Sequence, residues 1–253
     1  MTDPRTVAAR ALACLDLTNL DDVCDADAIT LLCRRARTPF GPVAAVCIWP
    51  EYVEQARREL ANSGIRVATV VNFPGGGEEM DDVRAETRGA LADGADEIDF
   101  VVPWRSLLSG HAEAVAASVR EIKEICGGAT LKAILETGEL KEPALIRRAA
   151  DEALAGGADF LKTSTGKVAV NATPEAAEIL LQAIRASGRD VGLKPAGGVR
   201  TVADAGTYLA LCDRVMGPGW ADPQHFRIGA SGVLTALLAA LEGTEALPAG
   251  QGY

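Results

Sequence analysis

The sequence predicts a parallel α/β fold closed into a (β/α)8 TIM barrel, as a single domain over residues 1–253. Short apolar runs alternate strictly with longer stretches of helical periodicity, which is typical of strand–helix units in a parallel sheet. Eight such units in 253 residues match the usual size of the closed barrel, and a doubly wound open sheet is the alternative. The runs span residues 11–17, 43–49, 66–73, 97–102, 131–137, 159–164, 191–197 and 225–231.

The stretches between these runs are expected to be helices, and several begin with residues typical of helix N-termini. Thr173 is placed as an N-cap before Pro174, and the pairs at 50–51 and 142–143 put an acid beside a proline near a helix start. The expected helices span residues 25–37, 50–60, 78–93, 112–125, 142–156, 173–187, 201–212 and 231–243.

Two junctions and the C-terminal tail complete the predicted organisation. Gly-Ala-Asp stands at 94–96 and again at 157–159, and we interpret it as a recurring helix-to-strand loop with a glycine C-cap. Residues 213–224 lengthen the last such connection. The tail at about 243–253 is small and polar up to Tyr253, so we expect it to be flexible.

Composition excludes several classes of protein. Hydrophobic residues make up 48% and aromatic residues 4%, which argues against disorder and favours helix-on-sheet packing. The net charge of −10 argues against a nucleic-acid partner, and without a run of about 18 apolar residues no membrane partner is expected. Six cysteines without a C-x-x-C pair, and an N-terminus without an apolar leader, predict a cytoplasmic protein with reduced thiols.

Charged residues interrupt several of the predicted strands. They are Asp16, Asp99, Lys132, Lys162 and Lys194. Strands of a parallel barrel are buried on both faces, so a charge there is costly unless it is paired or functional. We expect each to lie within its strand or towards its carboxyl end, where barrel enzymes carry their active sites, and the five to converge on one pocket.

The two lysines on the predicted sixth and seventh strands indicate a specific chemistry. A buried lysine beside another cation loses proton affinity, and a neutral amine is what Schiff-base formation requires. Either Lys162 or Lys194 serves as the nucleophile in this interpretation, and the other as the cation that lowers its pKa. Asp99 is then a candidate proton shuttle. The alternative is a structural ion network that fills one layer of the barrel.

Residues 162–174 resemble a phosphate-binding P-loop only in part. Leu161 and Val168 stand where that pattern needs a glycine and a hydroxyl residue. Gly166 and Lys167 nevertheless offer backbone N–H groups and a cation to a phosphate.

Two further segments fit a phosphate site. Gly197 and Gly198 follow the seventh predicted strand, and Ser231 and Gly232 begin the helix after the eighth. Barrels often bind phosphate at these two loops and at a helix N-terminus.

Histidine and cysteine give weaker indications. The chain's two histidines, His111 and His225, are too few for a histidine-rich metal site. Cys47 ends the second predicted strand, where it could face the pocket or serve as a small buried hydrophobe.

The chain resembles the 2-deoxyribose-5-phosphate aldolase family over nearly its whole length. The segments that carry the resemblance are LDLT (15–18), VCIWP (46–50), VVNFPGG (70–76), GADEIDFVVP (94–103), ILETGEL (134–140), GADFLKTSTGKVAVNAT (157–173), GLKPAGGVRT (192–201) and RIGAS (227–231). The resemblance implies reversible cleavage of 2-deoxy-D-ribose 5-phosphate to D-glyceraldehyde 3-phosphate and acetaldehyde through a lysine Schiff base. It implies no metal and no cofactor.

The resemblance also assigns roles by position. Lys162 matches the Schiff-base lysine, Lys194 the lysine that lowers its pKa, and Asp99 the proton-relay carboxylate. Residues that match the pocket lining are Asp16, Thr18, Cys47, Lys132 and Thr165. Residues that match the phosphate site are Gly166, Lys167, Gly197, Gly198 and Ser231.

Two positions and the partners need separate mention. Gly232 stands where close family members often have a second serine, so one hydroxyl contact to phosphate is lost there while the backbone N–H remains. Tyr253 matches a terminal tyrosine that reaches the active site in some members. The family's barrels usually form homodimers or larger homo-oligomers, and the implied partners are a sugar phosphate and acetaldehyde.

Two other functions stay open from the sequence. One is another class I aldolase of the same fold acting on a keto acid or ketose phosphate, although we find no additional arginine at the strand ends for a second anion. The other is a non-catalytic barrel that binds sugar phosphates.

Overall fold

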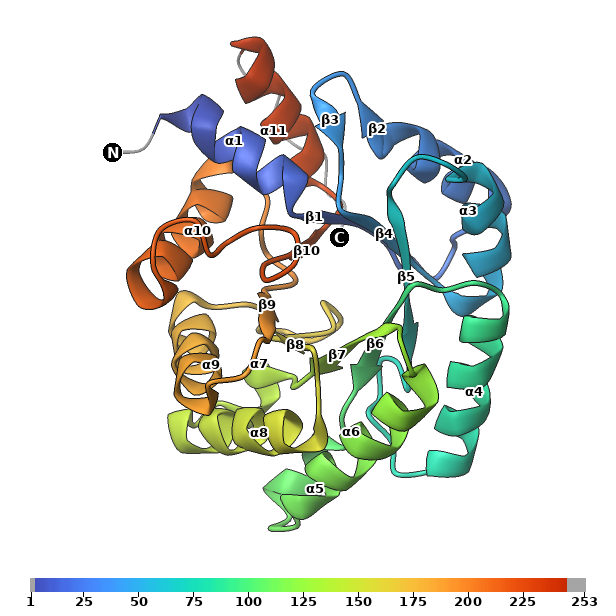
Figure 1. Cartoon of the computed structure of the whole chain (residues 1–253), viewed down its shortest axis with the longest axis vertical. Coiled ribbons are helices and arrows are strands. Elements are labelled where there is room, and N and C mark those ends of the chain that lie inside the picture. Colours follow the sequence, from blue (N-terminus) through green and yellow to red (C-terminus); the bar gives the residue numbers. More distant parts are fainter. Residues whose placement is uncertain (1–2, 245–253) are drawn as a thin grey trace.

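The computed structural model describes residues 3–244, and in it eight parallel strands form one sheet in the order β10-β1-β4-β5-β6-β7-β8-β9. Isolated bridges from Leu193 to Phe226 and from Ala196 to Gly229 join the two edges, so the sheet closes into a barrel (Figure 1). The strands are β1 (Leu15–Asn19), β4 (Ala45–Ile48), β5 (Arg66–Val71), β6 (Glu97–Val101), β7 (Thr130–Ile134), β8 (Phe160–Lys162), β9 (Gly192–Lys194) and β10 (Ile228–Ala230). The predicted (β/α)8 barrel is confirmed.

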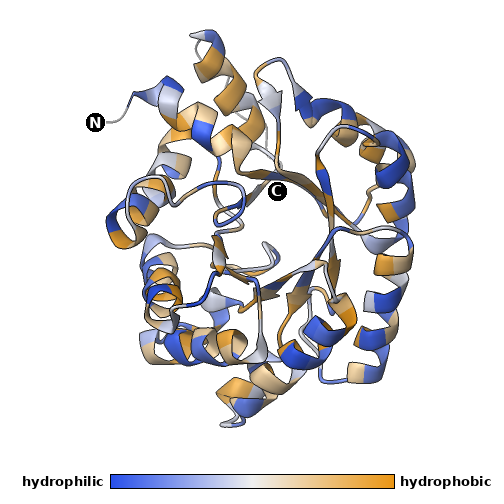
Figure 2. Cartoon of the chain, in the orientation of Figure 1, coloured by the Kyte–Doolittle hydropathy of each residue, from blue (hydrophilic) through white to orange (hydrophobic). Residues whose placement is uncertain are grey.

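Helices surround the barrel and cover its outer face (Figure 1). Hydrophilic residues follow the outer sides of α2, α3 and α4, while hydrophobic residues follow the strands (Figure 2), as amphipathic helices packed on a sheet require. The helices between successive strands are α2 (Ala26–Arg35), α3 (Val53–Glu59), α4 (Met80–Ala92), α6 (Glu113–Cys126), α8 (Pro143–Gly156), α9 (Pro174–Ser187) and α10 (Val202–Met216), and α11 (Val233–Glu242) follows β10.

The first predicted strand was placed too early. Residues 11–13 belong to α1 (Pro4–Ala13), whose N-cap Asp3 accepts a hydrogen bond from the backbone N–H of Thr6, and β1 begins only at Leu15. An apolar run does not distinguish the buried face of a short helix from a buried strand.

Short elements that the sequence analysis did not predict fill some of the connections. They are the hairpin of β2 (Arg37–Thr38) and β3 (Gly41–Pro42) and the helices α5 (Trp104–Leu108) and α7 (Thr137–Leu140). The helix expected over residues 50–60 begins as a 3-10 turn, η1 (Pro50–Tyr52), and continues as α3.

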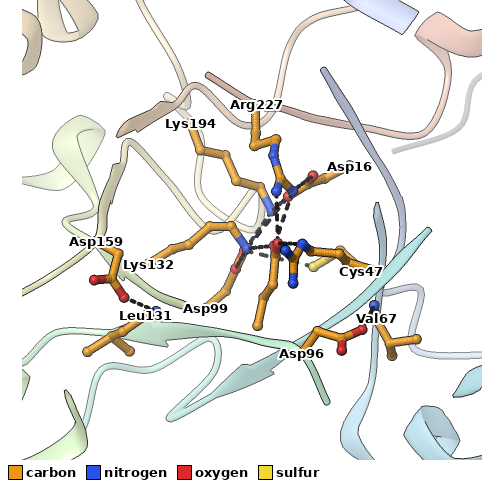
Figure 3. Close-up of polar contacts among 12 residues, drawn as sticks. Asp16, Cys47, Val67, Asp96, Asp99, Leu131, Lys132, Asp159, Lys194 and Arg227 are labelled. Atoms are coloured by element: carbon orange, nitrogen blue, oxygen red, sulfur yellow. Dashed lines mark hydrogen bonds and ion pairs between the residues drawn. The ribbon is translucent and has the colours of Figure 1, made fainter. Parts of the chain in front are cut away.

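The two Gly-Ala-Asp loops are confirmed as one recurring structural device. Gly94 and Gly157 both have positive φ, at 100° and 102°. The carboxylate of Asp96 accepts the backbone N–H of Val67 at 2.9 Å, and that of Asp159 accepts the N–H of Leu131 at 2.7 Å. Each aspartate therefore ties the start of one strand to the start of the next strand, which pins their register (Figure 3).

The predicted N-cap at the start of α9 is also confirmed. The Thr173 side chain accepts a hydrogen bond from the N–H of Ala176 at 3.1 Å, and Pro174 occupies the first helical position. Of the predicted tail at about 243–253, only Gly243 and Thr244 lie within the described residues. Within residues 3–244, none of the helices has the length and hydropathy needed to cross a membrane.

Candidate active site

The two lysines singled out from the sequence end adjacent strands at the same height. Lys162 is the last residue of β8 and Lys194 the last of β9, and the two are paired in register. Each Nζ lies 2.7 Å from the same atom, Oδ2 of Asp99. A single carboxylate oxygen thus joins two amines that are almost completely removed from water.

Asp99 comes from the middle of β6, where it pairs in register with Lys132 of β7. Lys132 Nζ donates to the other oxygen, Oδ1, at 2.9 Å. The thiol of Cys47 lies 3.9 Å from Oδ2. Three lysine amines and a thiol therefore surround this carboxylate inside the barrel.

Asp16 lies across the barrel interior from these groups (Figure 3). It is the second residue of β1, its Oδ2 lies 2.6 Å from Lys194 Nζ, and it is fully buried. Its register partner on β10 is Gly229, where an added Cβ would lie 3.0 Å from Cε of Lys194. The glycine therefore leaves the space through which Lys194 reaches Asp16.

The charges in this cluster reinforce one another. Burial by itself raises the pKa of Asp99, but the nearby Lys132, Lys162 and Lys194 outweigh it and hold that pKa well below its usual range. Burial lowers the pKa of Lys194, and the opposing pull of Asp16 and Asp99 more than compensates, so its pKa is raised. Lys194 consequently stays a cation and Asp99 an anion at neutral pH.

Sequence analysis missed two buried ions at the opposite, amino-terminal end of the strands. Glu97 is the first residue of β6, and Arg227 immediately precedes β10. Arg227 Nη2 donates to Glu97 Oε1 at 2.8 Å and Nη1 to Asp16 Oδ1 at 2.7 Å, while Lys132 Nζ bonds directly to Glu97. Arg227 lies at the end away from the pocket, so it is not an arginine for a second substrate anion.

The expectation that all five strand charges line one pocket was partly wrong. A pocket opens at the carboxyl ends of the strands, and its walls include Lys162 but none of the other four charges. Asp16, Asp99 and Lys132 sit in the middle of their strands, so their side chains fill a layer inside the barrel beneath the pocket floor, where Cys47 and Lys194 also lie fully buried. The predicted residues that do line the pocket are Thr18, Lys162, Thr165, Gly166, Gly197 and Gly198.

The predicted phosphate loops meet at this pocket. Gly166, Gly197 and Gly198 have φ values of 87°, 79° and 86°, a region that favours glycine. A Cβ on Gly197 would lie 2.7 Å from Cβ of Asn171, so the loop after β9 packs closely on the loop after β8. These turns expose backbone to the pocket without side chains in the way.

The remaining predicted phosphate residues lie near this pocket but outside its described wall. Lys167 Nζ pairs with Asp22 at 2.9 Å and lies 5.9 Å from the ring centroid of Trp49. Ser231 and Gly232 follow directly after Ala230, a wall residue, and Gly232 is the N-cap of α11.

Glu136 is a further residue that sequence analysis missed. It follows β7 with a left-handed backbone, φ 55° and ψ 54°, and it is 1% exposed. Its carboxylate accepts the hydroxyl of Thr165 at 2.6 Å and the backbone N–H of Thr165 at 3.2 Å. Because Thr165 is a wall residue, Glu136 anchors the loop that forms one side of the pocket.

Neither histidine lies at this site. His225 bridges Asp222 and Asp190 through its two ring nitrogens, at 3.0 and 2.9 Å, and His111 lines a separate surface groove. Within residues 3–244, no cluster of three or more histidine, cysteine, aspartate or glutamate side chains is arranged to hold a metal ion. Tyr253, predicted as a catalytic residue, lies outside the described residues.

An eight-stranded barrel with buried ions under a pocket at the carboxyl ends of its strands places the protein among the (β/α)8-barrel enzymes. The chain belongs to the DeoC/LacD family of aldolases, whose family model matches residues 10–235. The family resemblance found in the sequence is thereby confirmed, and the protein is an aldolase.

Individual relatives agree with this membership. The chain is 55% identical to the deoxyribose-phosphate aldolase of Agrobacterium fabrum over 252 residues, covering 99% of this chain and 97% of that protein. A crystal structure from Toxoplasma gondii ME49, provisionally named a deoxyribose-phosphate aldolase, has 30% identity and a TM-score of 0.86 over 95% of this chain and 98% of that one. The deoxyribose phosphate aldolase of Aeropyrum pernix, described as a tetramer, shares the fold with 24% identity and a TM-score of 0.73 over 93% of this chain and 91% of that one.

Proposed function

We propose that the protein catalyses the reversible aldol cleavage of 2-deoxy-D-ribose 5-phosphate to D-glyceraldehyde 3-phosphate and acetaldehyde, with Lys162 as the covalent nucleophile. The observation that carries the proposal is the amine of Lys162 in the pocket wall, sharing Asp99 Oδ2 with Lys194. The 55% identity to a deoxyribose-phosphate aldolase over nearly the whole chain supports the choice of substrate.

The reaction begins with attack of the neutral Lys162 amine on C1 of the open-chain sugar. The resulting carbinolamine loses water to form an imine. Removal of the proton from the C3 hydroxyl then breaks the C2–C3 bond, which releases D-glyceraldehyde 3-phosphate and leaves an enamine on Lys162. Protonation of the enamine carbon and addition of water free acetaldehyde and restore the amine.

The buried ions divide the remaining roles. Lys194 keeps its charge and disfavours a second charge on Lys162. Asp99 touches both amines and is the proposed proton carrier, acting directly or through water. Asp16, Lys132 and Cys47 surround Asp99 and Lys194 in the buried layer beneath the pocket. Thr18 faces the sugar from the pocket wall.

The loops at the pocket rim are the proposed phosphate site. Backbone N–H groups at Gly166, Gly197, Gly198 and Gly232 and the start of α11 at Ser231 suit an anion, because a helix N-terminus carries partial positive charge. Lys167 adds a cation near the rim, where Asp22 already pairs with it.

Covalent trapping with a reductant tests the proposed nucleophile. Acetaldehyde and borohydride should add one reduced two-carbon group per chain, and peptide mapping by mass spectrometry should locate it on Lys162. Lys162→Met should give no adduct and no measurable turnover while remaining folded. Lys141→Met, a matched loss of an exposed lysine, should leave trapping unchanged. A stoichiometric adduct on another lysine would contradict the assignment.

The same experiment separates the other candidate functions. A non-catalytic sugar-phosphate barrel gives no adduct, and an aldolase for keto acids or ketose phosphates is trapped by its own donor better than by acetaldehyde. Participation of Tyr253, association into homo-oligomers and a cytoplasmic location remain predictions from the sequence. Tyr253→Phe should slow proton exchange at the acetaldehyde methyl carbon if the tyrosine takes part.

A further inference from the structure

Six of the ions buried inside the barrel form a closed ring in which positive and negative charges alternate. In order of contact its members are Arg227, Asp16, Lys194, Asp99, Lys132 and Glu97. The first four contacts measure 2.7, 2.6, 2.7 and 2.9 Å, Lys132 bonds directly to Glu97, and Glu97 returns to Arg227 at 2.8 Å. The ring contains three cations and three anions, so it is electrically neutral.

The ring is isolated from water over most of its circumference. Five of its side chains are 0% exposed, and Arg227 is 5% exposed. Arg227 also donates Nε to the carbonyl of Pro223 at 2.6 Å. Electrostatic interactions inside such a ring are screened far less than those on the protein surface.

Lys162 is not a member of this ring, whose positive and negative charges are equal without it. Its Nζ contacts Asp99 Oδ2, the oxygen already shared with Lys194, and among residues 3–244 it contacts no second carboxylate within salt-bridge distance. Each cation of the ring contacts at least two carboxylates. A protonated Lys162 would therefore add a fourth cation to three anions, and a buried charge without its own partner is costly.

The other groups that face Lys162 do not supply the missing negative charge. Cys47 is fully buried, and burial raises the pKa of its thiol, which keeps it neutral. Glu136 interacts with Lys162 only at longer range, and its two oxygens are committed to Thr165.

We propose that Arg227 and Glu97, which close the ring at the amino-terminal ends of the strands, are positioning residues that set the proton affinity of the Lys162 amine, Arg227 by lowering it and Glu97 by raising it. Arg227 acts through Asp16, which holds Lys194, and Glu97 acts through Lys132, which holds Asp99. Neither side chain touches the pocket beside Lys162. The proposal rests on the proposed role of Lys162 as nucleophile.

Removing one charge from either residue should move the proton affinity of Lys162 in opposite directions. Arg227→Met leaves the ring with one excess negative charge, so the acid limb of the pH profile should move to higher pH. Glu97→Gln leaves one excess positive charge, so the limb should move to lower pH. Each shift should be about one pKa unit, the size expected for a unit charge at roughly 10 Å and an effective dielectric constant of about 20.

The measurement is the pH dependence of imine formation with acetaldehyde, trapped by cyanoborohydride and quantified on the intact protein, together with the pH profile of kcat/KM. The double variant Glu97→Gln/Arg227→Met restores a neutral ring and should return the limb to within about 0.3 units of the wild type. Arg66→Gln is the matched control. Arg66 lies 3.6 Å from Glu97 at the same end of the barrel, but it is 56% exposed, so its loss should not move the limb.

Each outcome bears on the proposal. Shifts of the same sign in folded single variants, or no shift in either, would overturn it, because a purely structural role has no reason to depend on the sign of the charge removed. If both single variants fail to fold, the double variant decides: a folded double variant with a wild-type limb supports charge balance, and an unfolded one refutes it. A wild-type adduct that maps away from Lys162 refutes the proposed function instead, which keeps the two failures distinct.

Discussion

The two ends of the barrel interior hold similar ions in different circumstances. At the amino-terminal end, Arg227 has two carboxylates and a backbone carbonyl for its donors, and Glu97 has three basic partners. At the open end, Lys162 shares one carboxylate oxygen with a second lysine. Ions with a full set of partners hold their charge, and under the proposed function the amine with a shared partner is the one that must give up its proton. The number of partners, more than burial, therefore distinguishes the two ends.

The largest effect is expected when the cation next to Lys162, at the carboxyl ends of the strands, is removed. Lys194→Met removes the cation nearest Lys162 and leaves Asp99 Oδ2 to Lys162 alone. The acid limb of the pH–rate profile should move upward by about two units. Because the neutral amine becomes scarcer, kcat/KM at pH 7 should fall by up to about 100-fold. An unmoved limb would show that burial alone governs the nucleophile.

A smaller effect is expected from a substitution at the pocket rim, which should change binding of the phosphate without changing the charge of the buried ring. Ser231→Asp adds a negative charge at the start of α11, so KM for the phosphorylated sugar should rise about tenfold or more. Activity on 2-deoxyribose without phosphate should change much less, and the acid limb should stay where it is. Equal losses on both sugars would place the phosphate elsewhere.

A modest effect is expected from the anchor of the pocket loop. Glu136→Gln keeps one acceptor for Thr165 but weakens the charge-assisted bond to its hydroxyl. KM should rise about threefold with little change in kcat, since the loop positions substrate and does not take part in proton transfer. Thr165→Val is the matched change on the other side of that bond. A fall in kcat with unchanged KM would instead give Glu136 a chemical role.

The smallest effect concerns stability across pH, where both ends of the barrel act together. The pKa values of Asp16, Glu97 and Asp99 are lowered in the folded protein, so their stabilisation is present above the ordinary carboxyl value near 4 and is lost as the pH falls through the folded values. The pKa values of Lys132 and Lys194 are raised, so their stabilisation is present below about 10.4 and is lost as the pH rises further.

Thermal unfolding followed by circular dichroism should accordingly show Tm nearly flat from about pH 5 to pH 9 and falling on both sides. Glu97→Gln should make the acid side shallower, by about 2–4 °C for each kcal/mol of linkage removed. Glu54→Gln, which alters an exposed carboxylate paired with Arg58, should leave both sides unchanged. A Tm that falls steadily between pH 5 and pH 9 would contradict this account.

Most of the fold, and the candidate site residues at the carboxyl ends of the strands, could be predicted from the sequence. Lys162, Lys194 and Asp99 were identifiable because charges inside apolar strands have few structural explanations. Glu97 escaped notice because an acid at the start of a strand reads as a boundary residue. It stands two residues before Asp99, however, and residues two apart on a strand share a face. That period would have placed Glu97 in the barrel interior.

Arg227 and Glu136 were harder to find, for different physical reasons. Arg227 lay inside the eighth predicted run, 225–231, but only three residues of that run form a strand, so the sequence did not show that Arg227 faces the barrel interior. The position of the Glu136 side chain depends on a left-handed backbone, which a residue with a side chain seldom adopts. No local sequence pattern predicts that backbone. The closed ring itself is a property of register across strands far apart in the chain, which a single sequence does not specify.

The two Gly-Ala-Asp loops have a consequence for the order in which the barrel assembles. Asp96 and Asp159 bond to residues 29 and 28 positions earlier, so each closes one strand–helix–strand unit with contacts of short sequence separation. Contacts of this kind form early because little chain entropy is lost in closing them. Closure of the barrel requires β10 to pair with β1, which comes from the opposite end of the chain, and to join β9 through isolated bridges. In pulse-labelled hydrogen exchange, amides of β5 to β8 should therefore gain protection before those of β1 and β10, and the buried ring would be completed only as the barrel closes.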